Sequence, residues 1–304
     1  MSLKNILTNW SAYRRGREEG GYQEYEHMWG MVIDLNKCIG CNACSVACYA
    51  ENNLAVVGKE RFEKNQAMHW MRVERYWDEP DLGDNKVQEY QIYGASFVPT
   101  NCQNCNAAPC EPVCPVEATY HTPDGLNAQV YNRCIGSRYC SNNCPYRLRY
   151  FNFWSYYERS WPAPLHMQLN PDLSVRDKGV MEKCTFCVQR IRAAKDKAQM
   201  EHRVVKEGGT AKVGDQEFMV AAGRPKLRDM EFQTACQQTC PTTAIVFGDL
   251  LNPESQVSKL WRTHQVELGR TTQTKENKEL RGYRLLEELN TDPCIMFLER
   301  VREV

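Results

Sequence analysis

The stretch from Cys38 to Cys48, CIGCNACSVAC, places four cysteines at the spacing C-x2-C-x2-C-x3-C. Three further groups follow along the chain. They are Cys102, Cys105, Cys110 and Cys114; then Cys134, Cys140 and Cys144, with Ser137 where the first group has its second cysteine; and then Cys184, Cys187, Cys236 and Cys240. The four groups form an internal repeat, and its unit is a cysteine-bearing loop that runs into a short helix.

Composition excludes several classes of protein. The chain has 304 residues with 38 basic and 38 acidic side chains, so its balance of charge does not indicate a nucleic-acid partner. Its longest apolar stretches, such as residues 244–247, are far shorter than the roughly 20 residues that span a bilayer. Arg14-Arg15 is not followed by an apolar segment, so we expect no signal peptide in the chain itself. Sixteen cysteines in such a sequence favour metal-binding thiolates over disulfides.

The spacing of the cysteines is typical of iron–sulfur clusters. Three cysteines two residues apart wrap one corner of a cluster, while the fourth reaches the neighbouring cluster in two-cluster ferredoxins and is followed by proline. Pro115, Pro145 and Pro241 each follow the last cysteine of a group. The alternative is zinc, which uses two CxxC pairs or mixes in histidine, but the six histidines lie away from the cysteine groups.

This crossover rule sorts fifteen cysteines into four sets, if the first group pairs with the fourth and the second with the third. Set 1 is Cys38, Cys41, Cys44 and Cys240; set 2 is Cys184, Cys187, Cys236 and Cys48; set 3 is Cys102, Cys105, Cys110 and Cys144; set 4 is Cys134, Cys140 and Cys114. We expect a [4Fe–4S] cluster on each of sets 1 to 3. Three thiolates favour a [3Fe–4S] cluster on set 4; a four-iron cluster with the Ser137 oxygen is the alternative, although hydroxyl replaces a soft ligand poorly.

Cys294 is left over. It lies in the apolar stretch 292–297 without a second cysteine nearby. A lone cysteine of this kind commonly packs as a small buried hydrophobe. We therefore do not expect Cys294 to be a ligand.

The repeat predicts an α+β fold, a duplicated two-cluster ferredoxin-like domain with a charged insertion and a helical C-terminal tail. The expected divisions are an N-terminal arm at 1–28, a four-cluster domain at 29–250 and a helix-rich extension at 251–304. Within the domain, residues 102–150 carry the inner cluster pair and 188–235 the insertion, with a helix at 189–199. Strands are expected at 32–35 and 244–247, and a hairpin between 118 and 131. Four apolar residues of the tail are candidates for docking it: Trp261, Leu285, Leu286 and Leu289.

Bulky aromatic and basic residues follow Cys144. They are Arg147, Arg149, Tyr150, Phe151, Phe153, Trp154, Tyr156, Tyr157, Arg159 and Trp161. Aromatic side chains together with arginine are typical of interface cores and of membrane-interface belts. The segment therefore predicts a docking surface, with a lining of the protein's own core as the alternative.

Several stretches give the chain a resemblance to a known family. They are residues 29–31 (WGM), 50–53 (AENN), 69–73 (HWMRV), 110–115 (CEPVCP), 134–146 (CIGSRYCSNNCPY), 181–190 (MEKCTFCVQR) and 286–291 (LEELNT). With the four groups, they resemble the four-cluster iron–sulfur subunits of the molybdopterin oxidoreductase superfamily. More narrowly, they resemble the iron–sulfur part of the cluster-bearing subunit of bacterial alternative complex III, a quinol oxidoreductase, although here that part stands alone.

The resemblance implies a non-catalytic redox subunit of an oxidoreductase complex. Its implied partners are an integral-membrane quinone-binding subunit near set 4, a molybdopterin-oxidoreductase-like subunit and c-type cytochromes. It implies a peripheral subunit at the periplasmic face of the cytoplasmic membrane, exported with a partner; the cytoplasmic face is the alternative. A quinone reductase complex, or an active molybdenum reductase of the polysulfide or tetrathionate type, would use the same cysteine framework. The residues themselves show no phosphate loop, nucleophile elbow or acid–base pair.

Overall fold

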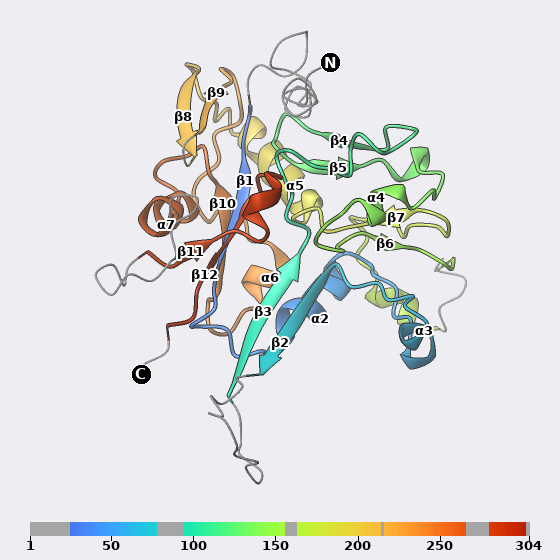
Figure 1. The fold of residues 1–304 in the computed structure, drawn as a ribbon. Coiled ribbons are helices and arrows are strands. Elements are labelled where there is room, and N and C mark those ends of the chain that lie inside the picture. Colours follow the sequence, from blue (N-terminus) through green and yellow to red (C-terminus); the bar gives the residue numbers. More distant parts are fainter. Residues whose placement is uncertain (1–24, 78–93, 156–162, 214–215, 266–279, 302–304) are drawn as a thin grey trace, which may run out of the picture.

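The structure, a computed structural model, describes residues 25–77, 94–155, 163–213, 216–265 and 280–301. They form a mixed α/β arrangement of short helices and small sheets (Figure 1). The arm expected at 1–28 lies outside these residues except for its last four. None of the described helices combines the length and apolar character that crossing a bilayer requires.

A four-stranded sheet joins the two ends of the described chain. Its first strand, β1 (Trp29–Asp34), pairs antiparallel with β10 (Ile245–Asp249) and parallel with β12 (Ile295–Leu298), and β11 (Gly282–Tyr283) completes the edge beyond β12. The strands expected near 32–35 and 244–247 are confirmed as β1 and β10. Because β1 has neighbours on both sides and is almost entirely buried, it forms the centre of the domain.

The two faces of β1 contribute to different cores. Trp29 and Ile33 point into the core that also contains most of the cysteines, whereas Val32 belongs to a second core with Trp261. Trp261 lies on α7 (Gln256–His264), which packs against the sheet (Figure 1). Alternating side chains of a strand point to opposite faces, so one short strand divides the cysteine-bearing core from the helix-covered side.

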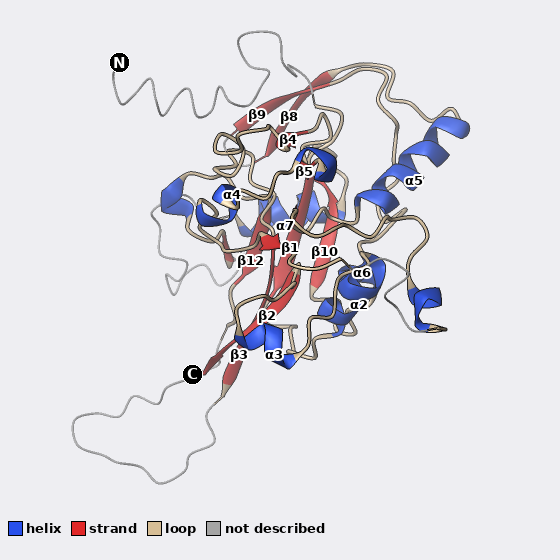
Figure 2. Cartoon of the chain, turned by 90° about the vertical axis from the view of Figure 1, so that its right-hand side faces the viewer, coloured by secondary structure: helices blue, strands red, loops and turns tan. Residues whose placement is uncertain are grey.

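The remaining elements are mostly short. The helices are α2 (Ala43–Glu51), α3 (Lys59–Glu63), α4 (Tyr139–Asn142), α5 (Val188–Met200), α6 (Ala235–Gln238) and the 3-10 turns η1 (Tyr131–Arg133), η3 (Leu165–Gln168) and η4 (Glu287–Leu289). The two-stranded sheets are β2 (Met71–Trp77) with β3 (Ala95–Asn101), β4 (Thr119–His121) with β5 (Asn127–Gln129), β6 (Tyr150–Phe151) with β7 (Met181–Glu182), and β8 (Gly209–Val213) with β9 (Gln216–Val220). The predicted hairpin is confirmed as β4–β5, and the predicted helix of the insertion as α5, which lies at the outside of the molecule (Figure 2).

The tail differs from the helix-rich expectation. Its described part contains one longer helix, α7, together with β11 and β12, which complete the central sheet. The apolar run of β12 is buried at all four positions, and such a run suits a strand inside a sheet. Trp261 is buried as expected, but Leu286 and Leu289 are 41% and 50% exposed, so these two leucines do not dock the tail in this chain.

Candidate metal centres

All sixteen cysteines lie in the described part of the chain, and no disulfide joins any two of them. Set 1 assembles where the loop before α2 meets the turn before β10. Burial raises the pKa of the Cys44 thiol to about 11, and the nearby thiols of Cys38, Cys240 and Cys41 add to this rise. The three cysteines of the N-terminal loop therefore face a fourth that comes from the far end of the domain.

Set 2 assembles one helical turn farther along α2. Cys48 stands near the end of that helix and is buried. Burial raises the pKa of its thiol well above the ordinary value, and the charges of Cys184, Cys187 and Cys236 raise it further. Because Cys44 and Cys48 belong to one short helix, α2 carries ligand candidates of two different sets.

The cysteines of sets 3 and 4 all lie in the segment of the chain between β3 and β6. Burial, followed by the charges of Cys102, Cys110 and Cys144, raises the pKa of the Cys105 thiol well above its ordinary value. In set 4, burial raises the pKa of the Cys140 thiol, and Cys134 and Cys114 contribute to the rise together with Cys110 of set 3. Within each set that the crossover rule groups, thiols from separate loops therefore lie close enough for their charges to act on one another.

The two halves repeat the same local geometry. In the loops before α2 and α4, Gly40 and Gly136 have φ of +70° and +72°. The helix-capping residues Asn42 and Arg138 share φ 61° with ψ of 7° and 6°. A Cβ on Gly136 would lie 2.3 Å from the Gly179 carbonyl oxygen, so that position requires glycine for space as well as for its backbone angle.

The Cys-Pro turns also match. The backbone N–H of Ala118 donates to Cys114 Sγ at 3.1 Å, and that of Ala244 donates to Cys240 Sγ at 3.3 Å. Hydrogen bonds to cluster sulfurs help to set reduction potentials. The duplication therefore reproduces the immediate surroundings of the sulfur atoms as well as the cysteine spacing.

Set 2 receives further hydrogen bonds from two asparagine side chains. Asn52 Nδ2 lies 3.5 Å from Cys48 Sγ, and Asn101 Nδ2 lies 3.4 Å from Cys184 Sγ. Both asparagines are buried. A buried amide that donates to sulfur stabilises the thiolate form, which is the form that binds iron.

Buried cations test whether these sites suit an anionic cluster. Arg149 is 4% exposed, and its Nη2 group donates to Thr119 Oγ1 at 2.7 Å and to Gln129 Oε1. Its Nε and Nη1 groups have no nitrogen or oxygen acceptor in the described part of the chain, and the Cys110 sulfur is the hydrogen-bonding neighbour of this guanidinium. Burial acts to lower the pKa of Arg149, but the charges of Cys110, Cys140 and Cys102 outweigh burial and raise it.

No carboxylate forms an ion pair with Arg149 among the described residues, in contrast to Arg176, whose Nη2 lies 2.9 Å from Glu182 Oε2. A buried charge without a counter-charge is costly. Thiolates carrying iron–sulfur clusters would supply negative charge on both sides of Arg149, since Cys110 belongs to set 3 and Cys140 to set 4. The donor set and its electrostatic surroundings therefore fit clusters of this type.

The cysteines described here are not arranged to bind a single metal ion. Within the described ranges, no group of three or more His, Cys, Asp or Glu side chains is arranged to hold one metal ion. A cluster does not require such close approach, because each thiolate binds a different iron.

Ser137 and Cys294 occupy different environments. Ser137 is exposed in the loop before α4, at the position that the exposed Cys41 holds in the loop before α2. Cys294 is 1% exposed and directly precedes β12.

The aromatic segment after Cys144 only partly matches the expected docking surface. Tyr150, Phe151, Phe153 and Trp154 are half-buried, and the guanidinium of Arg138 lies 5.0 Å from the ring centre of Phe151. Arg149, expected on this surface, instead points inward between sets 3 and 4, where thiolate charge stabilises it. Tyr156, Tyr157, Arg159 and Trp161 lie outside the described residues.

Sequence reasoning missed several buried polar groups around the cysteines. Lys183, Asn101 and Asn104 are completely buried, and each lies next to a cysteine in the sequence or one residue from it. The run NCQNCN at 101–106 contained the available signal. Four amide side chains so close to cysteines are unusual for a surface loop that has no role.

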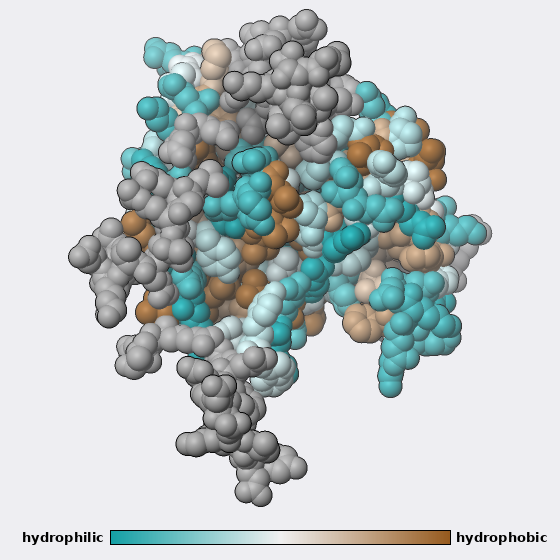
Figure 3. All heavy atoms as spheres, viewed as in Figure 1, coloured by the Kyte–Doolittle hydropathy of each residue, from teal (hydrophilic) through white to brown (hydrophobic). Residues whose placement is uncertain are grey.

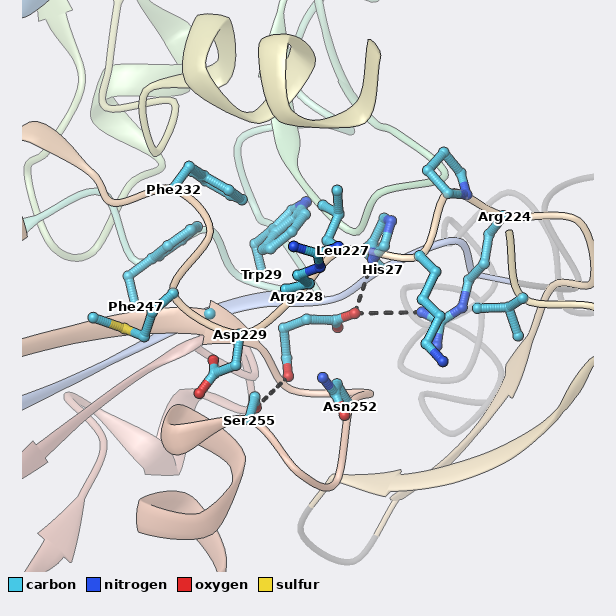
Figure 4. Close-up of a pocket in the computed structure, with 16 residues that line it drawn as sticks. His27, Trp29, Arg224, Leu227, Arg228, Asp229, Phe232, Phe247, Asn252 and Ser255 are labelled. Carbon is cyan, nitrogen blue, oxygen red and sulfur yellow. Dashed lines mark hydrogen bonds and ion pairs between the residues drawn. The ribbon is translucent and has the colours of Figure 1, made fainter. Parts of the chain in front are cut away.

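Two hollows lie near these elements. An open groove of about 800 Å³ beside set 1 is lined by Cys41, Val46 and Ala50 together with residues of α5. A smaller pocket of about 120 Å³, lined by residues such as His27, Trp29 and Arg224, contains no cysteine of any set (Figure 4). Asp249 also lines it, and its carboxylate lies 2.8 Å from His27 Nδ1 and 3.3 Å from Arg224 Nη1. These contacts join β10 to the insertion and to the segment just before β1, and we assign the pocket a structural role.

Comparisons with known proteins give consistent matches. Two family models, each described as a 4Fe-4S dicluster domain, match residues 37–118 and 93–157. The chain is 38% identical over 280 residues to the menaquinone reductase iron-sulfur cluster-binding subunit of Nitratidesulfovibrio vulgaris, covering 92% of this chain and 91% of that protein. It is 30% identical to the Hdr-like menaquinol oxidoreductase iron-sulfur subunit 1 of Archaeoglobus fulgidus, covering 78% and 77%. It is 29% identical to a subunit of the selenate reductase of Mesobacillus selenatarsenatis, covering 90% and 72%.

Proposed function

The chain belongs to the iron–sulfur cluster-binding subunits of the molybdopterin oxidoreductase family, and from this premise we propose its place in a redox complex. It is an electron-transfer subunit that binds [4Fe–4S] clusters in a quinone oxidoreductase or molybdenum reductase type of complex. We propose that sets 1 to 3 each hold a [4Fe–4S] cluster and set 4 a [3Fe–4S] cluster. The chain then conducts electrons between a membrane quinone-binding subunit and a molybdopterin-oxidoreductase-like subunit.

One observation supports this proposal: in each proposed set, thiols from separate loops lie close enough for their charges to shift one another's pKa. Ser137 stands where the sixteenth ligand would be expected. Bound clusters would supply one-electron carriers at these four positions. The residues of the chain do the rest. They hold the thiols, exclude water from most of them and place hydrogen-bond donors and cations beside them.

We propose that set 4 is at the quinone end. A set with three thiolates carries less negative charge than a set with four, which raises the reduction potential there. The exposed side chains beside it include Ile135, which is 67% exposed, and Tyr139. With the half-buried aromatic residues of β6 and the residues after it, they offer an apolar surface for a membrane partner.

Set 1 is at the opposite end of the proposed electron path from set 4. Ile39, in its loop, is 59% exposed, and the open groove lined by α2 lies beside it. The face seen in Figure 3 mixes hydrophilic residues with small hydrophobic areas. We propose that set 1 faces the molybdopterin-oxidoreductase-like subunit.

Among complexes of this type, the similarity to the menaquinone reductase subunit over nearly its whole length favours a quinone reductase complex. An alternative complex III-like quinol oxidoreductase has the same parts, and in either complex c-type cytochromes would be redox partners. The subunit would lie at the periplasmic face of the membrane. A molybdenum reductase is the second candidate, favoured by the similarity to the selenate reductase subunit.

The test is purification of the native complex under anaerobic conditions, with identification of its subunits and counts of iron, acid-labile sulfide, haem and molybdenum. Covalently bound haem without molybdenum would support the quinone oxidoreductase. Molybdenum in the complex would support the active reductase instead. If the chain holds little iron or sulfide, the cluster assignment fails in both cases.

A further inference from the structure

Lys183 joins the two halves of the cysteine framework. In the sequence it directly follows β7 and precedes Cys184. Its side chain is completely buried, at 0% exposure. The Nζ group donates to the backbone carbonyl of Cys184 at 2.9 Å and to Oδ1 of Asn104 at 3.4 Å. Asn104 stands between Cys102 and Cys105 of set 3, whereas Cys184 belongs to set 2. One ammonium group therefore contacts the loops of both central sets.

The charge of Lys183 has no carboxylate counter-charge among the described residues. Its two recorded acceptors are a carbonyl and an amide oxygen, both neutral. The adjacent carboxylate, Glu182, is paired with Arg176 at 2.9 Å. Burying an ammonium without a counter-charge is unfavourable unless another source of negative charge lies close by. Once they bind clusters, the thiolates of sets 2 and 3 would be that source.

Sets 2 and 3 also approach each other directly at this place. Burial raises the pKa of the Cys184 thiol, and the charge of Cys102 in set 3 contributes to the rise, whereas Lys183 opposes it. Asn101, next to Cys102, donates to Cys184 Sγ at 3.4 Å. The loops of sets 2 and 3 are thus in contact with each other and with the ammonium group of Lys183.

We propose that Lys183 is a positioning residue for electron transfer, a fixed positive charge shared by sets 2 and 3 that raises the reduction potential at both. A cation beside only one set would separate the two potentials, whereas a shared cation raises both and leaves their difference small. With clusters bound, an electron that crosses would oxidise the cluster of one central set by one electron and reduce the cluster of the other by one. This inference rests on the proposed function, because it concerns the potentials of the clusters assigned there.

The experiment is a potentiometric titration of the native complex followed by electron paramagnetic resonance. Lys183→Gln keeps donors for Asn104 and the Cys184 carbonyl but removes the charge. We expect the reduced-to-oxidised ratio of two of the four clusters to fall at least tenfold at a fixed potential, which corresponds to about 59 mV for one electron. The other two clusters should change less than threefold, and Lys183→Arg should stay within threefold of the wild type.

The matched control is Lys195→Gln. Lys195, on α5, is a partly buried lysine whose charge is already balanced by Glu26 at 2.5 Å and Asp124 at 2.7 Å. Its substitution should leave all four potentials within threefold of the wild type. The proposal is overturned if Lys183→Gln, with full iron and sulfide content, leaves every potential unchanged. It is equally overturned if Lys195→Gln or Lys183→Arg lowers the same two potentials as strongly.

A second variant covers the case in which Lys183→Gln does not retain iron. Asn104→Asp brings a carboxylate to the ammonium and neutralises it without removing Lys183, so the same two potentials should fall. An unchanged pair of potentials in an iron-replete Asn104→Asp complex would contradict the proposal. A wild-type complex without iron would instead contradict the proposed function, so the two failures are distinguishable.

Discussion

Cys41 and Ser137 occupy the same position in two loops that share one backbone conformation. Each follows a glycine, Gly40 with φ +70° or Gly136 with φ +72°, and each side chain is exposed. Each also precedes a residue with φ 61° that begins a helix. The two sets therefore differ at this position by one atom, sulfur or oxygen, in closely similar surroundings.

Replacing Ser137→Cys is expected to convert a three-iron centre into a four-iron centre. The added thiolate would bind a fourth iron and lower the potential at set 4, because the type of cluster helps to set the reduction potential. The measurement is the loss of the three-iron resonance from the oxidised protein, with a gain of one iron per chain. Ser137→Ala is the control and should keep the three-iron resonance. If the oxidised wild type lacks that resonance and Ser137→Ala acquires it, the serine oxygen is a ligand and our assignment is wrong.

The reverse exchange, Cys41→Ser, is expected to create a second three-iron centre at set 1. Its exposed position should allow this change without repacking the core. The integrated three-iron resonance of the oxidised protein should double while the iron content falls by one per chain. Cys294→Ala, which removes a cysteine outside the sets, should leave both quantities unchanged; a loss of iron in this control would make Cys294 a ligand after all.

Arg149→Met is expected to lower the potentials of the two clusters on sets 3 and 4. The substitution removes a buried positive charge beside Cys110 and Cys140. Thr119 Oγ1 loses its Arg149 donor, whereas Gln129 Oε1 keeps the hydroxyl of Thr119 as a donor. A tenfold fall in the reduced-to-oxidised ratio, or about 59 mV, is the expected size. Arg149→Lys should recover part of the shift. Arg147→Met, which changes an exposed arginine two residues earlier, is the control and should have no effect.

The buried pair of Arg176 and Glu182 is expected to contribute to stability rather than to potential. Arg176→Met would leave a buried carboxylate whose other recorded donor is Asn152, at 3.1 Å, and should cost about 3–5 kcal/mol in the free energy of unfolding. The double variant Arg176→Met/Glu182→Leu should regain most of this loss in urea denaturation. Glu60→Gln breaks the exposed Glu60–Lys64 pair and should cost less than about 1 kcal/mol. If the double variant is no more stable than Arg176→Met, the unpaired carboxylate of Glu182 is not the cause of the lost stability.

Asp249 predicts a dependence of stability on pH. Burial acts to raise the pKa of this carboxyl, but the hydrogen bond from His27, the Met28 backbone N–H and the charge of Arg224 together lower it below the ordinary value. Its contribution to stability is therefore complete above the unfolded pKa of about 3.9 and is lost as the pH falls through the lowered native pKa.

Asp249→Asn should accordingly cost about 3 kcal/mol at pH 7, and the difference from the wild type should narrow as the pH falls below about 4. Anaerobic urea denaturation followed by circular dichroism measures this difference. Asp196→Asn changes an exposed aspartate on α5 and should show no such trend. A difference that stays constant with pH would contradict the assignment.

The repeat in the sequence was sufficient to predict the duplicated cysteine loops, the hairpin β4–β5 and the strands near β1 and β10. Those features depend on local spacing, on turn residues and on apolar alternation, which act over a few positions. The assignment of the thiols to four sets rests on the sequence, because the Cys-Pro step indicates that the fourth cysteine of each group reaches across to another loop, and it stays a prediction. Whether each set binds its cluster stays a proposal.

Only the tertiary structure decided which charged side chains point inward. Lys183 and Arg149 stand in segments whose sequence is equally compatible with a solvent-facing side chain, and their burial depends on thiols contributed by distant loops. The same is true of β12, since the pairing of a C-terminal strand with β1 depends on contacts between the two ends of the chain. Local residue patterns determine loops and ligands, but the place of an uncompensated charge depends on the sum of long-range contacts around it.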